Sequence, residues 1–144
     1  MYNTPVTRLV MVSDTSANLP CTHLDTVNDA AKVATCLIGD RPVEHVLAIF
    51  LDSARRITGV SIVSIGTAIM CLFDVKQVLR TVLMSHAECF VLAHNHPDGI
   101  PTPSMADMET TMVLRKACKT VGISMLAHVV VTADPTKFQE VITP

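Results

Sequence analysis

Three short runs of apolar residues, each bounded by polar or turn-forming segments, limit most strongly what this chain can fold into. They lie at residues 46–51, 89–93 and 123–132. The first two are apolar throughout, which is typical of strands buried on both faces, and the third is largely apolar. Residues 57–65 also have strand character, and the polar turn at 52–56 would join them to the first run as a hairpin. We therefore expect a sheet at the centre of the fold.

The segments between these strands have the apolar periodicity of helices packed on one side. The first helix opens at residues 25–26, and Gly39 is its expected stop. Asp74 can cap a second helix, while Ser104 begins a third helix that ends at Gly122. The order of elements predicts an α/β (mixed) fold, a single layered domain with a mixed β-sheet flanked by helices.

The two ends of the chain and one internal segment carry weaker patterns. Residues 1–24 are expected to form an N-terminal arm, with a short strand at 9–12, and residues 25–144 to form the folded domain. Residues 94–103 hold three prolines and one glycine, so we expect a loop there. The tail after Pro135 has no clear assignment.

Composition excludes several classes of protein. The formal net charge is −2 and no basic run occurs, which argues against a module that binds duplex DNA. The five cysteines are odd in number and form no Cys-x-x-Cys pair, as expected for reduced, mostly buried thiols. Because the sequence shows neither a signal peptide nor an apolar stretch of about 20 residues, we expect a soluble cytoplasmic protein without a membrane partner.

The segment with the most chemical information is residues 94–97, His-Asn-His-Pro, followed by Ser104 and Asp107. Histidines at positions i and i+2 of an extended chain project to the same side. The proline-rich loop would return the next helix toward the end of the strand, which brings Asp107 near. Two imidazoles and one carboxylate with an open fourth position are the ligand set of a catalytic zinc site. The pattern predicts a Zn²⁺ site made by His94, His96 and Asp107.

A structural interpretation of the same residues stands beside the metal site. Ser104-x-x-Asp107 is a capping-box pattern, in which Asp107 bonds back to the start of the helix. Taken alone, this is the stronger interpretation of Asp107, and a carboxylate folded back on the cap can hardly also bind a metal. His94 and His96 would then be ordinary loop residues.

His94-x-His96-Pro97, six residues, Ser104, two residues and Asp107 together resemble the JAMM motif of JAB/MPN metallopeptidases. The resemblance covers roughly residues 25 to 133 and is greatest to the RadC branch. Many RadC proteins carry an extra N-terminal helix-hairpin-helix region, for which this chain has no room, so we expect the short, stand-alone form. Further matches to the RadC branch lie at residues 51–52, 65–67, 98–104 and 122–123.

The resemblance implies a catalytic mechanism and one further residue. The family uses a glutamate upstream of the histidines as general base, which by its position before the first core strand is Glu44. From its own surroundings Glu44 would be a solvated acid at a strand end. The implied reaction is zinc-dependent hydrolysis of a peptide or isopeptide bond in a peptide or protein substrate. Glu44 would take a proton from water and pass it to the leaving amine, while the Ser104 hydroxyl would donate to the oxyanion.

Two positions depart from the pattern of the family. Asp98 stands where the family commonly has serine, and Ala127 stands before His128 where it commonly has aspartate. If that aspartate supports a metal ligand, its absence would weaken or tune zinc binding. His128 is retained, either to support a ligand or as a half-buried strand histidine.

Other functions remain open on the sequence. The domain could be a DNA-repair-associated module with weak or no activity, or a metal-dependent nucleic-acid hydrolase. A basic groove beside His94 and His96 would favour nucleic acid, whereas a narrow apolar cleft would favour a peptide. Residues 86–88, His-Ala-Glu, imitate the His-x-Glu of zinc deaminases, but no Pro-Cys-x-x-Cys follows. We interpret them as helix-end and turn residues. The sequence leaves the oligomeric state undetermined.

Overall fold

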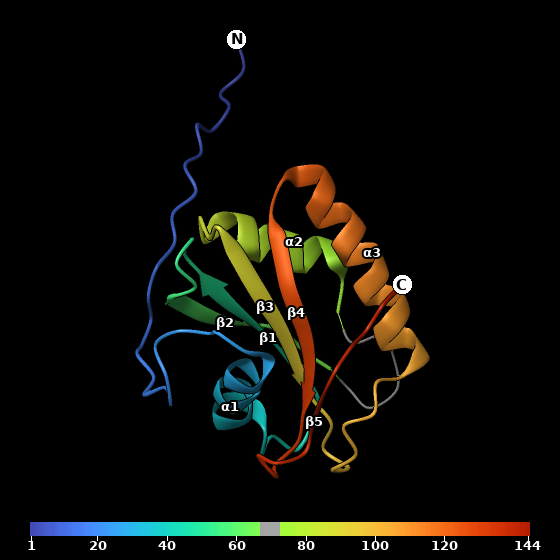
Figure 1. The fold of residues 1–144 in the computed structure, drawn as a ribbon. Coiled ribbons are helices and arrows are strands. Elements are labelled where there is room, and N and C mark those ends of the chain that lie inside the picture. Colours follow the sequence, from blue (N-terminus) through green and yellow to red (C-terminus); the bar gives the residue numbers. More distant parts are fainter. Residues whose placement is uncertain (67–72) are drawn as a thin grey trace.

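The computed structural model describes residues 1–66 and 73–144. In these residues the chain forms three helices and one five-stranded sheet, which confirms the expected mixed α/β class (Figure 1). The sheet has the order β2-β1-β3-β4-β5, in which only β3 and β4 run parallel. The elements are α1 (Val27–Ile38), β1 (His45–Leu51), β2 (Ile57–Ile65), α2 (Val75–Met84), β3 (Cys89–Asn95), α3 (Met105–Val121), β4 (Ser124–Val131) and β5 (Phe138–Glu140).

Helices cover both faces of the sheet, which explains why its central strands are largely apolar. Ile49 and Val91 pack in a cluster with α1 on one face. Phe50 and Leu92 pack in a second cluster with α2 and α3 on the other face (Figure 1). Strand β3 lies at the centre and is buried at every residue. The central position of β3 therefore holds the polar residues at its end, His94 and Asn95, in a fixed place.

The helices begin where the sequence predicts, and Gly39 and Gly122 end two of them in different backbone conformations. Asp74 caps α2, and Gly122 ends α3 in the left-handed conformation with φ 77°. Gly39 follows α1 in an ordinary right-handed conformation, with φ −60°. A Cβ on Gly39 would lie 2.6 Å from the Thr35 oxygen and 2.7 Å from the Thr132 oxygen. The predicted stop at Gly39 is confirmed, since α1 ends at Ile38. Close approach to the backbone of Thr132, and not a left-handed conformation, is the physical reason for glycine.

Strand β3 extends further than its apolar run. The expected loop begins too early, because β3 includes His94 and Asn95. His94 pairs with Val46 of β1 and with Val130 of β4, so its backbone is held on both sides. Buried polar side chains can stand inside a strand when each has a hydrogen-bond partner.

Both ends of the chain differ from expectation. Residues 1–19 contain no helix or strand, and the N-terminal end of this segment extends from the body of the domain (Figure 1), whereas Leu19 packs against the core. The expected strand at 9–12 is therefore wrong, because these residues pair with no other strand and their side chains are exposed. At the other end, β5 adds an edge strand to β4 that the sequence pattern did not assign. The boundary between residues 24 and 25 stays a prediction.

The cysteines are less buried than expected. Cys89 and Cys118 are buried, Cys21 is half-buried and Cys36 is exposed, and none of these four forms a disulfide. Cys71 lies outside the described residues. So does Thr67, which is part of the resemblance to the RadC branch at residues 65–67. Within the described part of the chain, the helices are too short or too polar to cross a membrane.

Candidate metal centre

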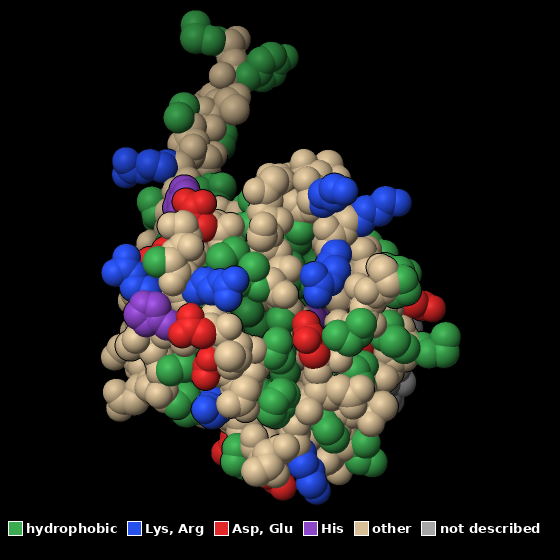
Figure 2. Space-filling view, viewed as in Figure 1, with side chains coloured by type: hydrophobic (Ala, Val, Ile, Leu, Met, Phe, Trp, Pro, Cys, Tyr) green, Lys and Arg blue, Asp and Glu red, His purple; other side chains and the backbone are tan. Residues whose placement is uncertain are grey.

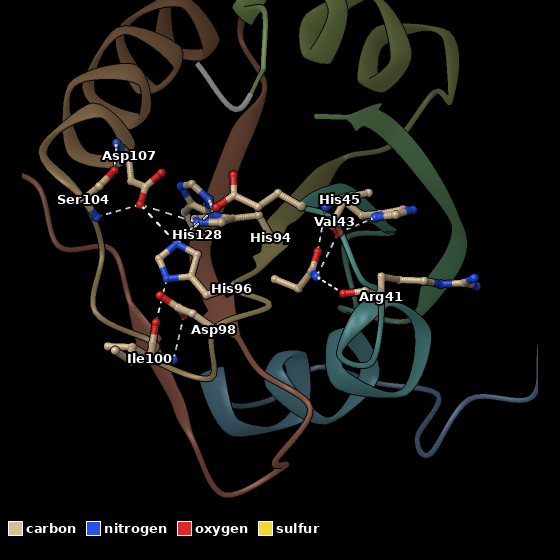
Figure 3. A network of polar contacts seen from close by, with 12 residues as sticks. Arg41, Val43, His45, His94, His96, Asp98, Ile100, Ser104, Asp107 and His128 are labelled. Carbon is tan, nitrogen blue, oxygen red and sulfur yellow. Dashed lines mark hydrogen bonds and ion pairs between the residues drawn. The ribbon is translucent and has the colours of Figure 1, made fainter. Parts of the chain in front are cut away.

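Three predicted ligands meet at the end of strand β3. His94 is fully buried in the strand, His96 follows it with a side chain 13% exposed, and Asp107 is buried in the first turn of α3. The two Nε2 atoms lie 3.1 Å apart. Asp107 Oδ2 lies 3.5 Å from His94 Nε2 and 3.6 Å from His96 Nε2 (Figure 3). Among the described residues, these three side chains form a group that could hold a metal ion.

A chain of hydrogen bonds determines which nitrogen of His94 carries its proton. The Thr111 hydroxyl donates to the Asp107 carbonyl, so it accepts from Nδ1 of His128 at 2.6 Å. Burial holds the pKa of His128 well below its usual range, so this ring is neutral and its Nε2 is an acceptor. His94 Nδ1 lies 2.8 Å from that Nε2 and must donate to it. His94 Nε2 therefore presents a lone pair to Asp107 and His96.

The turn after β3 determines which nitrogen of His96 carries its proton. His96 Nδ1 lies 2.7 Å from the carbonyl oxygen of Ile100, which can only accept, so Nδ1 carries a proton. Asp98 accepts the backbone N–H of Ile100 at 2.9 Å, and Gly99 takes a positive φ of 78° in this turn. Asp98 thus shapes the turn that supports His96 (Figure 3). When His96 is neutral, its Nε2 also offers a lone pair.

The convergence of these atoms fits a divalent metal. Two imidazole lone pairs that face each other at 3.1 Å repel unless a cation lies between them. Asp107 Oδ1 is buried and accepts no hydrogen bond from the described residues, which leaves it available to a metal or to water. Two imidazoles and a carboxylate match the ligand chemistry of zinc and related metals.

Asp107 takes part both in the helix cap and in the metal group, by which we mean the candidate ligands His94, His96 and Asp107. Its Oδ2 accepts the Ser104 backbone N–H at 2.7 Å, and the Ser104 hydroxyl accepts the Asp107 N–H at 3.1 Å. The capping box is therefore present, as predicted. The expectation that capping would turn the carboxylate away from the histidines was wrong, because the first turn of α3 lies directly beside them. One carboxylate has enough acceptor positions for both.

Electrostatics within the group favour a negative carboxylate beside positive charge. Burial alone would raise the pKa of Asp107, but its contacts with the His94 and His96 rings and the hydrogen bond from the Ser104 amide hold it well below its usual range. The same Asp107 carboxylate raises the pKa of His96 against the opposing effect of burial. Without a metal, a proton on a histidine supplies the positive charge that the carboxylate attracts. A metal ion would replace that proton.

Glu44 borders the group but is not one of the three candidate ligands. It lies directly before β1, with its side chain 35% exposed, and its Oε1 is 4.0 Å from His96 Nε2. A carboxylate that faces both solvent and the metal group is suited to exchange protons with water. Glu44 thus lies where the family resemblance implies its general base.

Position 127 faces away from the metal group. Ala127 packs in the cluster with α1, whereas His128 faces the opposite side of the sheet and bonds to His94 and Thr111. The absence of an aspartate at 127 therefore removes no direct support for His94. His128 is fully buried and bonded to a candidate ligand, so the alternative of a half-buried strand histidine was wrong.

Two supporting residues were missed from the sequence. Thr111 stands one turn after Asp107 on α3, and Asn95 stands between the two histidines. A polar residue inside an otherwise buried strand, as Asn95 is, is a signal that could have identified it, because it needs partners. Thr111 had no such signal, since threonine is common on helix surfaces. His86 lies in the turn after α2, with φ 56°, as expected for a residue outside the site.

Comparisons with known proteins agree with this site. Residues 24–141 match the family described as RadC-like JAB domain. A UPF0758 protein of Coprothermobacter proteolyticus is 33% identical over 107 residues, which cover 74% of this chain and 46% of the relative. A UPF0758 protein of Finegoldia magna is 34% identical over 111 residues, which cover 75% and 50%. One of Bordetella parapertussis is 33% identical over 99 residues, which cover 69% and 44%.

The chain spans about half the length of these curated relatives. The matched region nevertheless contains the whole sheet, the three helices of the described residues and the His-His-Asp group. On this match, the chain belongs to the RadC-like JAB domain family.

Proposed function

We propose that this protein is a zinc-dependent hydrolase of amide bonds, in peptides or between proteins linked by isopeptide bonds. The observation that carries the proposal is the convergence of two imidazole Nε2 atoms and the Asp107 carboxylate. His94 and His96 each donate through Nδ1, so both Nε2 lone pairs are directed at one point. Three protein ligands with an open fourth position are typical of catalytic zinc sites.

Zinc in such a site supplies Lewis acidity, which polarises a carbonyl group and makes water acidic enough to lose a proton near neutral pH. Glu44 then accepts a proton from water at its carboxylate and returns it to the leaving amine. Its Oε1 lies 4.0 Å from His96 Nε2, so it borders the reaction region without occupying a ligand position. Partial exposure of Glu44 lets water reach it.

The Ser104 hydroxyl is proposed to donate to the oxyanion that forms during amide hydrolysis. Its oxygen accepts the Asp107 N–H in the capping box, which uses a lone pair and leaves the hydroxyl proton for another acceptor. The cap also holds the hydroxyl on the same helix turn as a candidate ligand. A donor fixed in this way costs little reorganisation during the reaction.

A peptide is favoured over nucleic acid by the charges near the site. The charges that act on His96 are the carboxylates of Asp107 and Glu44, which would repel phosphate groups. Figure 2 shows lysine and arginine side chains interspersed with acidic ones on the face that it presents. Nucleic-acid binding instead favours basic residues gathered along one surface. Two exposed apolar side chains offer contacts for a peptide: Ile100, whose carbonyl oxygen bonds to His96, and Met105, which follows Ser104 in the chain.

The first prediction concerns the metal. After loading and dialysis the full chain should retain close to one zinc per molecule, and His96→Ala should lose most of it, because a three-ligand site cannot spare an imidazole. Elemental analysis measures the zinc content. His86→Asn is the matched control, since asparagine tolerates the positive φ of this exposed turn residue. Full zinc content in His96→Ala would contradict the site.

The second prediction separates binding from chemistry. Zinc-loaded protein should cleave a peptide or an isopeptide-linked substrate and leave single-stranded DNA intact. Glu44→Gln should keep zinc and fold but lower turnover by about 10²- to 10⁴-fold, because an amide cannot accept the proton. Glu88→Gln, at an exposed acid outside the site, is the control. Loss of zinc in Glu44→Gln would make Glu44 a ligand, and cleavage of DNA alone would contradict the substrate class.

The third prediction tests Ser104. Ser104→Ala should cost about 0.5–2 kcal/mol of stability through loss of the cap. It should also lower kcat by roughly 100-fold through loss of an oxyanion donor. Ser104→Asp keeps a good N-cap but places a carboxylate near the oxyanion, so it should fold and be inactive. Thermal unfolding and steady-state kinetics measure the two effects. Full activity in Ser104→Asp would leave Ser104 only the capping role.

The fourth prediction tests support of His94 by His128. His128→Phe keeps an aromatic ring but leaves the buried His94 Nδ1 proton without its acceptor, so zinc affinity should fall by about 10- to 100-fold. Thr111→Val should lower affinity in the same direction. Competition with a chelator measures the zinc dissociation constant without any substrate. Thr120→Val, which removes a hydroxyl from an exposed position on the same helix, is the control. Unchanged affinity in His128→Phe would show that His94 needs no such support.

A further inference from the structure

Asn95 stands between the two histidines but does not face the metal group. It is fully buried. Its Oδ1 accepts the His45 backbone N–H at 2.6 Å. Its Nδ2 donates to the carbonyl oxygens of Arg41 at 3.2 Å and Val43 at 3.1 Å. One acceptor and two donors of the same amide are thus used, and the partners determine which atom is oxygen and which is nitrogen.

These bonds lie on both sides of Glu44. Val43 precedes it and His45 follows it, so Asn95 holds the two peptide units that flank the proposed base. The segment before Glu44 is exposed and outside any helix or strand, and its other bonds are local: Arg41 N–H to the Ile38 carbonyl at 3.2 Å, and His45 Nδ1 to the Val43 carbonyl at 2.8 Å. The Glu44 carbonyl itself accepts the Gly66 N–H at 2.9 Å.

The strand register explains why a side chain is needed here. Strands β1 and β3 pair antiparallel, with Val46 opposite His94, so His45 lies next to Asn95. At this point the His45 N–H bonds to the side chain of Asn95. The amide therefore continues the connection between the strands for one residue beyond the ladder and reaches back to Val43. Apolar side chains could fill the space but could not bond to these backbone groups.

We propose that Asn95 is a positioning residue that fixes the Glu44 segment to the strand that carries His94 and His96. The inference rests on the proposed function, in which Glu44 is the base. A base must be held within a fraction of an ångström of its working position, and a displacement of about 1 Å can cost roughly 100-fold in rate. Because Asn95 follows His94 directly on β3, the spacing between Glu44 and the metal group is set by the same strand.

A purely structural role for Asn95 makes a different prediction. It would lower stability and increase amide hydrogen exchange throughout the sheet, with no dependence on Glu44. A positioning role acts on the Glu44 segment and loses its effect on turnover when the base is absent. The amides of His45 and Gly66 are suitable reporters, because the first bonds to Asn95 and the second to the Glu44 carbonyl.

The test uses the zinc-loaded full chain and the variant Asn95→Ala, with Asn95→Ser in its place should the alanine variant not fold. Thr132→Val is the matched control, since Thr132 is also buried, directly after β4, and donates its hydroxyl to backbone carbonyls away from Glu44. We expect kcat to fall about 100-fold with zinc content unchanged. Exchange at His45 and Gly66 should rise at least about tenfold, with Ile49 in β1 little changed.

The double variant with Glu44→Gln decides how Asn95 acts. We expect Asn95→Ala to lower the residual turnover of Glu44→Gln no further. An equal fall in both backgrounds, a kcat no lower than that of Thr132→Val, or unchanged exchange at His45 and Gly66 would overturn the inference. Full turnover in Glu44→Gln, or failure to cleave any amide substrate, would instead overturn the proposed function. The exchange rates would then still decide whether Asn95 holds the Glu44 segment.

Discussion

The burial of two consecutive polar side chains, His94 and Asn95, at the end of β3 is the constraint on which the rest of this site depends. A strand between two others and under helices on both faces offers no water to His94 or Asn95, so each must bond within the protein. His94 bonds to His128, Asn95 bonds to the backbone around Glu44, and His96 bonds to Ile100. These hydrogen bonds supply partners for the polar side chains and also orient the two imidazole rings and the Glu44 segment.

The helix cap likewise combines a structural bond with the orientation of Asp107, the third candidate ligand. The capping box satisfies two backbone N–H groups at the start of α3, which would otherwise lack partners. It also fixes Asp107 beside His94 and His96, with one oxygen bonded to the cap and the other free of hydrogen bonds from the described residues. The Thr111 hydroxyl links the Asp107 carbonyl to His128 and so back to His94. Two of the three candidate ligands therefore belong to one hydrogen-bonded circuit.

Much of this could be predicted from the sequence because it depends on local patterns. Apolar runs gave the central strands, cap residues gave the helix starts, and the spacing of His94, His96 and Asp107 gave the metal group. Gly39 ends the first helix as predicted, but its close approach to Thr132 could not be foreseen, because Thr132 lies far away in the sequence. Glu44 came from family resemblance alone, since only strand pairing brings it to the histidines.

The supporting contacts were beyond sequence reasoning for the same reason. Asn95 reaches residues about 50 positions earlier, and His128 lies 34 positions after His94. Which partner each buried group finds depends on strand order, and the crossing from β3 through α3 to β4 brings His128 beside His94. Residues that are adjacent in sequence can also be separated by the fold. Ala127 directly precedes His128 but lies on the other face of the sheet.

The central claim is that His94 and His96 both carry a proton on Nδ1 and direct Nε2 at one metal ion. Long-range ¹H–¹⁵N NMR of the imidazoles in the zinc-loaded full chain tests it most directly, since nitrogen shifts distinguish protonated from metal-bound positions. The account predicts that both rings are Nδ1–H tautomers with Nε2 bound to zinc. Binding of zinc through Nδ1 of either ring, or rings that remain unbound at full zinc loading, would contradict it.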